Sequence, residues 1–319
     1  MKILFIVLLS VFGAATLFLL FTFVCFLLVF YSPKRKPLSP DEYDVPKGEI
    51  YEVFREDIIG WTKEMRSLPH QKLSITSHDG LTLRAKYYEC KKGAPIEILF
   101  HGYRGSSERD LCGGVHRCFH LGRNALIVDQ RAAGESDGHI ITFGIRERLD
   151  CKRWVEYAIE KFGEDSKIIV TGISMGAATV MMALKDELPR QVVCALADCG
   201  YTSPKDIIKK VLGDLRLPAS VFYPVIKLGA KIFGRFDLEE ASSVEGVKNC
   251  KIPIIFIHGE NDDFVPCDMS RELFEVCASP RKKLYTVCGA GHGLAFPSDR
   301  ESYYKALLNF EAEYNNQQM

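Results

Sequence analysis

The chain is organised around the stretch Lys167-Ile-Ile-Val-Thr-Gly-Ile-Ser-Met-Gly-Ala-Ala-Thr179. An apolar, β-branched run stops at Gly172, and a run of small residues with helical character begins after Ser174. This is the strand–turn–helix context in which G-x-S-x-G lifts a serine hydroxyl above the edge of a sheet. The turn has no room for side chains at Gly172 and Gly176, and it puts the N–H of Met175 at a helix N-terminus. The alternative is an ordinary Ser/Gly turn between a buried strand and a helix, so the rest of the chain must decide.

Composition indicates a globular protein. The chain has 319 residues, of which 47% are hydrophobic and 26% charged, enough for one large α/β domain or two small ones. It carries 41 basic and 41 acidic residues, so its charge does not indicate a nucleic acid or an acidic partner. It has no visible repeat or low-complexity tract.

The N-terminus reads as a membrane anchor. Residues 3–31 form an apolar run of 29 residues without a charge, which exceeds the ~20 residues that span a bilayer. A signal peptide has a shorter apolar core and a small-x-small cleavage site. This run ends in Leu27-Leu-Val-Phe-Tyr31 instead. We therefore predict an uncleaved single-pass anchor over residues 1–31 in the cell membrane, and not a buried core helix.

Two observations favour a cytoplasmic location for the domain that follows the span. A third leaves the side of the membrane open. Residues 34–36 are basic, whereas only Lys2 and the free amine precede the span, which favours a cytoplasmic C-terminal domain. Ten of the 11 cysteines lie outside the span and read as reduced thiols in so large a domain. A large domain can nevertheless be exported regardless of its flanking charge.

The rest of the chain divides into a linker and a larger domain. Residues 32–66, with four prolines, predict a juxtamembrane linker that enters a short amphipathic helix. Residues 67–319 then begin with two alternating strands around the turn His78-Asp79-Gly80, which predict a hairpin. Buried strands alternate with helices from Ile96 onward, which is typical of a parallel sheet with helices on both faces. The expected strands are 96–100, 125–129, 167–172, 194–198, 252–258 and 283–288, and the expected helices are 106–121, 145–162, 175–187, 267–278 and 298–314.

One interval interrupts this alternation. Residues 200–247, which we call the lid segment, lack a strand pattern and contain apolar helical patterns at 204–212 and 219–233. An insertion at the carboxyl end of a sheet predicts a helical lid over the site. The alternative is an ordinary pair of connecting helices.

A serine nucleophile needs a base and an acid, and both have candidates at strand ends. His292 lies among glycines in the loop Cys288-Gly-Ala-Gly-His-Gly293 after the last strand, which suits a general base. The acid follows the strand 254–258 in the turn that contains Asp262 and Asp263. These neighbours cannot both point at the histidine, and the spacing of Asp262 before Val265-Pro266 favours Asp262. The resulting order is Ser174, Asp262, His292.

The oxyanion donors are expected from two loops. The Tyr103 N–H, in the loop after the strand 96–100, would join the Met175 N–H in binding a tetrahedral oxyanion. His101 is the rival base, although a packed position at the strand end explains it better. The Arg104 side chain is a possible pocket residue.

These motifs resemble the α/β-hydrolase superfamily. The ordered set is His101-Gly102, Gly172-x-Ser174-x-Gly176, Asp262-x-x-Val265-Pro266 and Gly291-His292, together with Asp129-Gln-Arg-Ala-Ala-Gly-Glu-Ser136. With the anchor, the chain is similar to bacterial single-pass hydrolases that are esterase-, lysophospholipase- or serine-aminopeptidase-like. Ala132-Ala133 departs from the pattern, since relatives often carry Gly or His there.

The resemblance implies an α/β-hydrolase fold with a mostly parallel, eight-stranded sheet, of which the first hairpin forms an antiparallel edge. It also implies a variable lid after the sixth strand, and neither a metal nor an organic cofactor. Arg131 is expected to bind a carboxylate such as Glu147 and to leave the substrate untouched.

A metal site has to be weighed separately. Cys112, His116 and His120 recur on one face of a predicted helix, with Cys118 nearby. Structural zinc usually takes four ligands from paired short spacings across a turn. Helix packing is therefore the preferred interpretation.

Three functions follow from the sequence. The first is a serine hydrolase that cleaves a small-molecule acyl ester such as a monoacylglycerol or a lysophospholipid. The second is an aminopeptidase or amide hydrolase, with Glu239, Glu240 or Glu245 as an anchor for a free amine. The third is a non-enzymatic binding module on the same scaffold. The pattern predicts no nucleic-acid partner and specifies no oligomeric state.

Overall fold

The computed structural model describes residues 1–34, 36 and 38–315. Its centre is an eight-stranded sheet in the order β1-β2-β4-β3-β5-β6-β7-β8. Strand β2 pairs antiparallel with both β1 and β4, and the other neighbours are parallel. The predicted hairpin and the mostly parallel sheet are confirmed. The strands are β1 (Gln71–Thr76), β2 (Thr82–Tyr88), β3 (Ile96–Phe100), β4 (Asn124–Asp129), β5 (Ile168–Ile173), β6 (Val192–Asp198), β7 (Ile254–Gly259) and β8 (Lys282–Val287).

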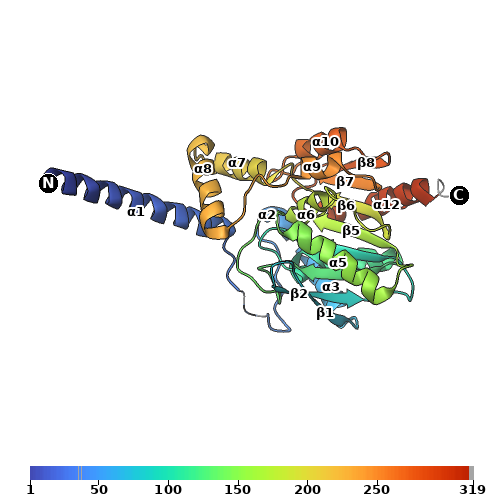
Figure 1. The fold of residues 1–319 in the computed structure, drawn as a ribbon. Helices are drawn as coiled ribbons and strands as arrows, with labels where there is room; N and C mark the ends of the chain where they lie inside the picture. Colours follow the sequence, from blue (N-terminus) through green and yellow to red (C-terminus); the bar gives the residue numbers. More distant parts are fainter. Residues whose placement is uncertain (35, 37, 316–319) are drawn as a thin grey trace.

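Helices cover both faces of this sheet because the strands are apolar on both sides (Figure 1). In β3 the side chains alternate, so that Ile98 and Phe100 face one helical layer and Leu99 faces the other. The first layer holds α5 (Glu147–Phe162), α6 (Met175–Ala183), α9 (Ser243–Lys248) and α10 (Cys267–Val276), and the second holds α3 (Arg55–Ser67), α4 (Ser107–His120), α11 (Ala295–Ser298) and α12 (Arg300–Asn315).

Helix α6 is shorter than its sequence pattern predicts. The pattern extends to residue 187, whereas the helix ends at Ala183 and continues into turns. Asp186 and Glu187 are exposed, and Pro189 follows. Pro189 disfavours the helical conformation of Leu188 only, so it sets a limit that the helix cannot pass, whereas the end at Ala183 comes earlier than this limit requires.

A third apolar cluster lies outside the two layers. We call it the lid cluster, because it joins the lid segment to the end of the N-terminal helix α1 (Lys2–Phe30). The lid segment contains α7 (Pro204–Asp214), α8 (Ala219–Gly229) and the π-helical turn η1 (Ala230–Gly234). In Figure 1, α1 projects away from the sheet, and α8 crosses the end of α1 that is next to the domain.

The short helix α2 (Glu49–Glu52) completes the N-terminal part of the chain. Together with α3 it belongs to the region that the sequence predicts as a linker with a helix. This region is packed into the domain, because α3 buries Ile58, Trp61 and Met65 among the other elements of the second layer.

Candidate active site

The turn after β5 has the geometry that its glycines require. Ser174 adopts φ 56° and ψ −118°, a strained left-handed conformation between Ile173 and the first residue of α6. A Cβ at Gly172 would lie 2.1 Å from the backbone carbon of Gly176, and one at Gly176 would lie 2.0 Å from the Phe100 oxygen. Only glycine therefore permits this turn, which holds the serine at the sheet edge.

Three side chains from three strand ends form a continuous relay. His292 Nε2 lies 2.9 Å from Ser174 Oγ, and His292 Nδ1 lies 2.7 Å from Asp262 Oδ2. The structure thus brings together the serine, histidine and aspartate that the sequence singles out. In this order of contacts the imidazole can take the serine proton, while the carboxylate fixes the ring and its tautomer.

Asp262, and not Asp263, occupies the position beside the histidine. The Asp262 carboxylate is buried and accepts the Phe264 and Val265 N–H groups at 3.0 and 2.8 Å, whereas Asp263 is exposed. Burial opposes its charge, but hydrogen bonds from His258 and His292 lower the pKa of Asp262 to about 2. Asp262 is therefore ionised at neutral pH.

His258 is a neighbour of the relay to which sequence reasoning gives no role. Its Nε2 lies 2.8 Å from the Val265 oxygen and 3.2 Å from Asp262 Oδ2, and its Nδ1 lies 2.6 Å from Ser270 Oγ. The ring is fully buried and fixes the turn that carries Asp262. Its position at the end of an apolar strand, four residues before the acid, is the sequence signal that could have indicated this contact.

The loop after β3 lies beside the serine, since a Cβ at Gly102 would lie 3.5 Å from Ser174 Cβ. The Gly105 N–H closes a turn onto the Gly102 oxygen at 3.1 Å, and the Gly102 N–H is held by Asp110 Oδ2 at 3.0 Å. The Tyr103 N–H, between them, is not used by this turn. Met175 is the first residue of α6, where helical N–H groups lack intrahelical partners. Tyr103 is therefore in a loop beside Ser174, and Met175 follows Ser174 at the start of α6.

His101 has a structural environment. Its Nδ1 lies 2.8 Å from the Gly102 oxygen, and its Nε2 accepts the Gln130 N–H at 3.0 Å. The ring is 1% exposed and joins the loop after β3 to the loop after β4. This agrees with the packed strand-end interpretation.

The side chains of Tyr103 and Arg104 contact α1. The Tyr103 hydroxyl donates to the Val29 oxygen at 2.6 Å, and the Arg104 guanidinium donates to the Leu28 and Tyr31 oxygens at 2.8 Å each. These carbonyls are at the C-terminal end of α1, where helical oxygens lack intrahelical partners. Arg104, predicted as a possible pocket residue, binds the end of the N-terminal helix and is not among the described residues that line the cavity beside Ser174.

The expected partner of Arg131 is wrong. Its guanidinium binds Asp150 through two bonds of 2.6 and 2.7 Å and also reaches Asp79 at 2.9 Å. Glu147 instead accepts the Thr142 and Gly144 N–H groups at 2.8 and 2.9 Å. Glu147 and Asp150 are neighbours on one helical turn of α5, so the sequence pattern could not choose between them. As expected, Arg131 holds a loop in place.

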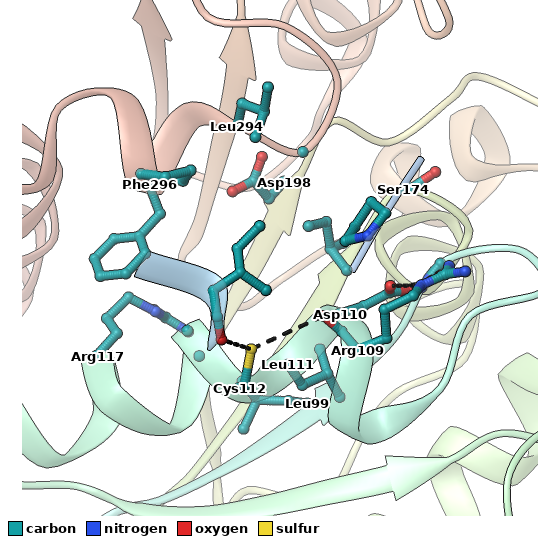
Figure 2. Close-up of a pocket in the computed structure, with 18 of the residues that line it drawn as sticks. Leu99, Arg109, Asp110, Leu111, Cys112, Arg117, Ser174, Asp198, Leu294 and Phe296 are labelled. Atoms are coloured by element: carbon teal, nitrogen blue, oxygen red, sulfur yellow. Dashed lines mark hydrogen bonds and ion pairs between the residues drawn. The ribbon is translucent and has the colours of Figure 1, made fainter. Parts of the chain in front are cut away.

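A cavity of about 180 Å³ opens beside Ser174 and His292. Its walls come from the second layer and include Tyr51, Ile58, Trp61, Leu111 and Phe296. Figure 2 shows Phe296 and Arg117 on one side of this pocket and Ser174 on the other. Among its described lining residues, none belongs to the lid segment. The region predicted as a juxtamembrane linker therefore supplies part of the wall, which the sequence did not indicate.

Asp198 is a buried carboxyl group in the wall of the same cavity. Its Oδ2 accepts the Tyr303 hydroxyl at 3.1 Å, whereas its Oδ1 has no hydrogen-bond partner within the described part of the chain. Burial raises the pKa of Asp198 to about 6. The cavity thus combines apolar walls with one poorly satisfied carboxyl group.

The cysteine and histidines predicted to share a helix face in α4 have other contacts. Cys112 Sγ lies 3.8 Å from the Ile58 oxygen, His116 Nδ1 lies 2.7 Å from Glu64, and the His120 ring stacks on Tyr304. This supports helix packing over metal binding. A group of potential metal ligands in the described residues is Cys199, Asp262 and His292, two of which already bind each other in the relay.

The acidic residues considered as amine anchors have cationic partners. Glu239 pairs with Lys227, Glu240 with Arg148 at 2.8 Å and Glu245 with Lys185 at 3.6 Å. All three are exposed, and none lines the cavity.

Comparison with known proteins gives consistent relatives. YqkD of Bacillus subtilis is 26% identical over 203 residues, which are 63% of this chain and 66% of YqkD. The membrane protein YNL320W of Saccharomyces cerevisiae is 20% identical over 255 residues, 79% of this chain and 83% of its own. The esterase Pf2001 of Pyrococcus furiosus has the same fold, with a TM-score of 0.63 at 22% identity over 88% of this chain and 99% of the esterase.

The likeness to the esterase structure confirms the α/β-hydrolase fold. Helix α1 is long and apolar enough to be a candidate transmembrane anchor. The membrane protein among the relatives agrees with a membrane association. Residues 143–318 match the model of the prolyl oligopeptidase family, a stretch that contains all three residues of the relay. Since this match covers more than half of the 319 residues, the chain belongs to the prolyl oligopeptidase family of α/β-hydrolases.

Proposed function

We propose that the protein is a serine hydrolase that cleaves carboxylic esters through an acyl-enzyme. The observation that carries this proposal is the unbroken relay from Ser174 through His292 to Asp262, with contacts of 2.9 and 2.7 Å. Family membership supports the hydrolase activity.

Each residue of the relay has a defined step in this reaction. Ser174 Oγ attacks the ester carbonyl carbon while His292 Nε2 takes the serine proton, and the N–H groups of Tyr103 and Met175 bind the resulting oxyanion. Collapse of the tetrahedral intermediate breaks the C–O bond, and the leaving alkoxide takes the proton from His292. A water molecule then gives a proton to His292 and attacks the acyl-enzyme, which releases the acid and returns the proton to Ser174. Asp262 stays ionised throughout and stabilises the imidazolium.

The cavity supports an acyl group as the part of the substrate next to the serine. Most of its lining side chains are aliphatic or aromatic, and it adjoins both Ser174 and His292. Its charged lining residues are Arg109, Asp110, Arg117 and Asp198. Its volume of about 180 Å³ is below the roughly 300–1,000 Å³ of sites for drug-sized ligands. We therefore expect a short acyl group in the cavity and the leaving alcohol outside it.

A fluorophosphonate probe tests the nucleophile directly. The purified full chain should be labelled, and Ser174→Ala should lose the label and the hydrolysis of p-nitrophenyl esters while keeping its thermal unfolding midpoint. Equal labelling of the wild type and Ser174→Ala would refute the assignment. A series of p-nitrophenyl esters that differ in acyl length should show a maximum at short chains.

Amide hydrolysis is a second candidate, which Asp198 favours. Asp198 lines the cavity, and its Oδ1 has no hydrogen-bond partner among the described residues, which makes this carboxyl group a candidate acceptor for a substrate amine. A comparison of aminoacyl arylamides with acyl esters decides between the two candidates. If the amide reaction is the natural one, arylamides should have the higher kcat/KM, and Asp198→Asn should lower it selectively.

A further inference from the structure

The end of α1 is packed into the lid segment. Phe26 and Phe30 are 3% and 0% exposed in the lid cluster, and Phe30 contacts the rings of Phe143 and Phe236 edge to face. Helices α8 and α1 pack closely at Gly229, where a Cβ would lie 3.0 Å from Phe26 Cβ and 3.1 Å from the Thr22 oxygen. The absence of a side chain at Gly229 therefore lets the two helices come close together.

The length of α1 locates this contact relative to a bilayer. Its 29 residues exceed the ~20 residues that cross the hydrocarbon core by about two turns. The buried residues of α1 begin at Thr22, close to the point where a span that starts at the N-terminus is complete. The Phe21 and Phe23 rings, next to that point, contact Phe222 and Phe233 of the lid segment. When α1 crosses a bilayer, α8 and η1 lie at its surface.

Figure 1 shows that α8 runs across α1. A helix that crosses a membrane span in this way extends along the membrane surface. Residues 215–236 contain four basic residues and no acidic one. Three large apolar side chains in this stretch also face outward, with exposures of 64% for Leu215, 58% for Val221 and 46% for Ile232. Apolar side chains beside basic ones are typical of helices that lie in the interface of an anionic membrane.

We propose that the exposed residues of the stretch 215–236, which contains α8 and η1, bind the surface of a bilayer that contains anionic phospholipids. This lid surface consists of Leu215 and Arg216 before α8, Val221 in α8, Lys231 and Ile232 in η1, and Arg235 just after η1. Its apolar side chains enter the acyl boundary while its cations contact phosphate groups. The lid segment then acts as a second membrane contact beside α1, and it holds the catalytic domain in one orientation. This inference does not depend on the proposed reaction.

Tryptophan fluorescence in vesicles tests the lid surface in the full chain. The native Trp61 and Trp154 are both buried in the domain, at 7% and 0% exposure, so their signal can be subtracted. Val221→Trp places a new indole on the lid surface. Leu308→Trp is the matched control, because Leu308 is also exposed, at 50%, and belongs to α12 on the far side of the domain (Figure 1).

In phosphatidylcholine vesicles with phosphatidylserine, lipids with brominated acyl chains should quench the added fluorescence of Val221→Trp several-fold more than that of Leu308→Trp. Equal quenching at the two positions would overturn the proposal. A blue-shifted Val221→Trp emission without quenching would also overturn it, because a protein contact, such as a second copy, would then cover the surface.

The contribution of the basic side chains to lipid binding is tested separately. Lys231→Glu in the Val221→Trp background should lower the quenching and remove its dependence on phosphatidylserine. Lys248→Glu reverses another exposed lysine, in α9, and should leave both unchanged. An identical response of the two charge reversals would contradict the anionic-lipid part of the proposal.

Discussion

The segment 43–67 and the lid segment 200–247 flank the same serine and differ in what they contact. The first packs on the second helical layer and supplies walls of the cavity through Ile58 and Trp61. The second packs on the end of α1, and none of its described residues lines that cavity. Ile173 packs against the second layer and Met175 belongs to the lid cluster, so the residues on either side of Ser174 connect it to both regions.

This difference separates two kinds of selectivity. If the cavity holds the acyl group, as proposed, a side chain that lines it changes the relative rates of different substrates. A side chain in the lid cluster is away from this cavity and changes the stability of the contact between α1 and the lid segment. Substitutions that are chemically identical should therefore have different effects in the two regions.

The largest effect is expected where both regions meet, at the relay. Asp262→Asn removes the carboxylate that orients His292, and we expect kcat to fall by about 10⁴-fold with every substrate. The neighbouring Asp263→Asn should leave kcat close to that of the wild type because its side chain is exposed. Steady-state kinetics on one ester measures both variants. A larger loss in Asp263→Asn would reverse the assignment of the acid.

The next effect compares one isoleucine from each region. Ile58→Ala and Ile226→Ala both empty a buried site, at 7% and 3% exposure, and each should cost about 2–5 kcal/mol of stability. Only Ile58→Ala enlarges the cavity, so only this variant should shift the preferred p-nitrophenyl ester toward longer acyl chains. If Ile226→Ala produced the same shift, the lid segment would have to be a wall of the substrate site.

The titration of Asp198 tests the cavity side alone. Burial raises the pKa of this group from 3.8 to about 6, so the folded protein keeps a proton that the unfolded chain has released. The contribution of Asp198 to the free energy of unfolding should therefore fall by about 3 kcal/mol as the pH rises from ~4 to ~6. Asp262 acts in the opposite direction, since its pKa is lowered to about 2 and its contribution is lost only as the pH falls below ~4.

Thermal unfolding of the full chain in detergent at several pH values measures this effect. Burial also raises the pKa of Asp150 to about 6, so Asp198→Asn should remove about half of the dependence between pH ~4 and ~6 and leave the part that is due to Asp150. Asp214→Asn, an exposed position at the end of α7, is the matched substitution in the lid segment and should keep the wild-type profile. An unchanged profile in Asp198→Asn would show that another group titrates there.

A smaller effect is expected from one tyrosine in each region. The Tyr51 hydroxyl donates to the His292 oxygen and the Tyr223 hydroxyl to Glu239, each at 3.0 Å. Loss of one such bond costs about 1 kcal/mol. Because Tyr51 holds the backbone of the base, Tyr51→Phe should lower kcat by about 5-fold, with little change in KM. Tyr223→Phe should leave kcat unaffected, and a similar decrease in both variants would remove the distinction between the regions.

The sequence predicts the fold because local patterns specify it. The apolar strands, the tight turn at Ser174 and the hairpin at 78–80 depend on neighbouring residues alone, and their positions agree with the structure within a few residues. The order of serine, aspartate and histidine is also readable, since each follows a strand whose carboxyl end is on the same sheet edge.

The sequence does not predict the walls of the site, because they depend on packing between distant segments. Pro46 and Tyr51 reach the cavity from a stretch whose prolines and charges predict a linker. The lid segment has the apolar composition expected of a substrate cover, yet the same composition suits contact with a membrane helix. Asp198 ends an ordinary buried strand, and only the cavity beside it distinguishes its carboxyl group.

If α1 spans a bilayer, as proposed, its surplus length makes this protein sensitive to hydrophobic mismatch. Residues 22–30 can be covered either by the lid cluster or by lipid, and a thicker bilayer would favour lipid by fractions of a kcal/mol for each ångström. Because Tyr103 and Arg104 bind the carbonyls at the end of this helix, movement of α1 would be transmitted to the proposed oxyanion loop. We expect turnover in reconstituted bilayers to decline modestly as the lipid chains lengthen. A turnover that is independent of chain length would mean that the last two turns of α1 remain fixed to the domain.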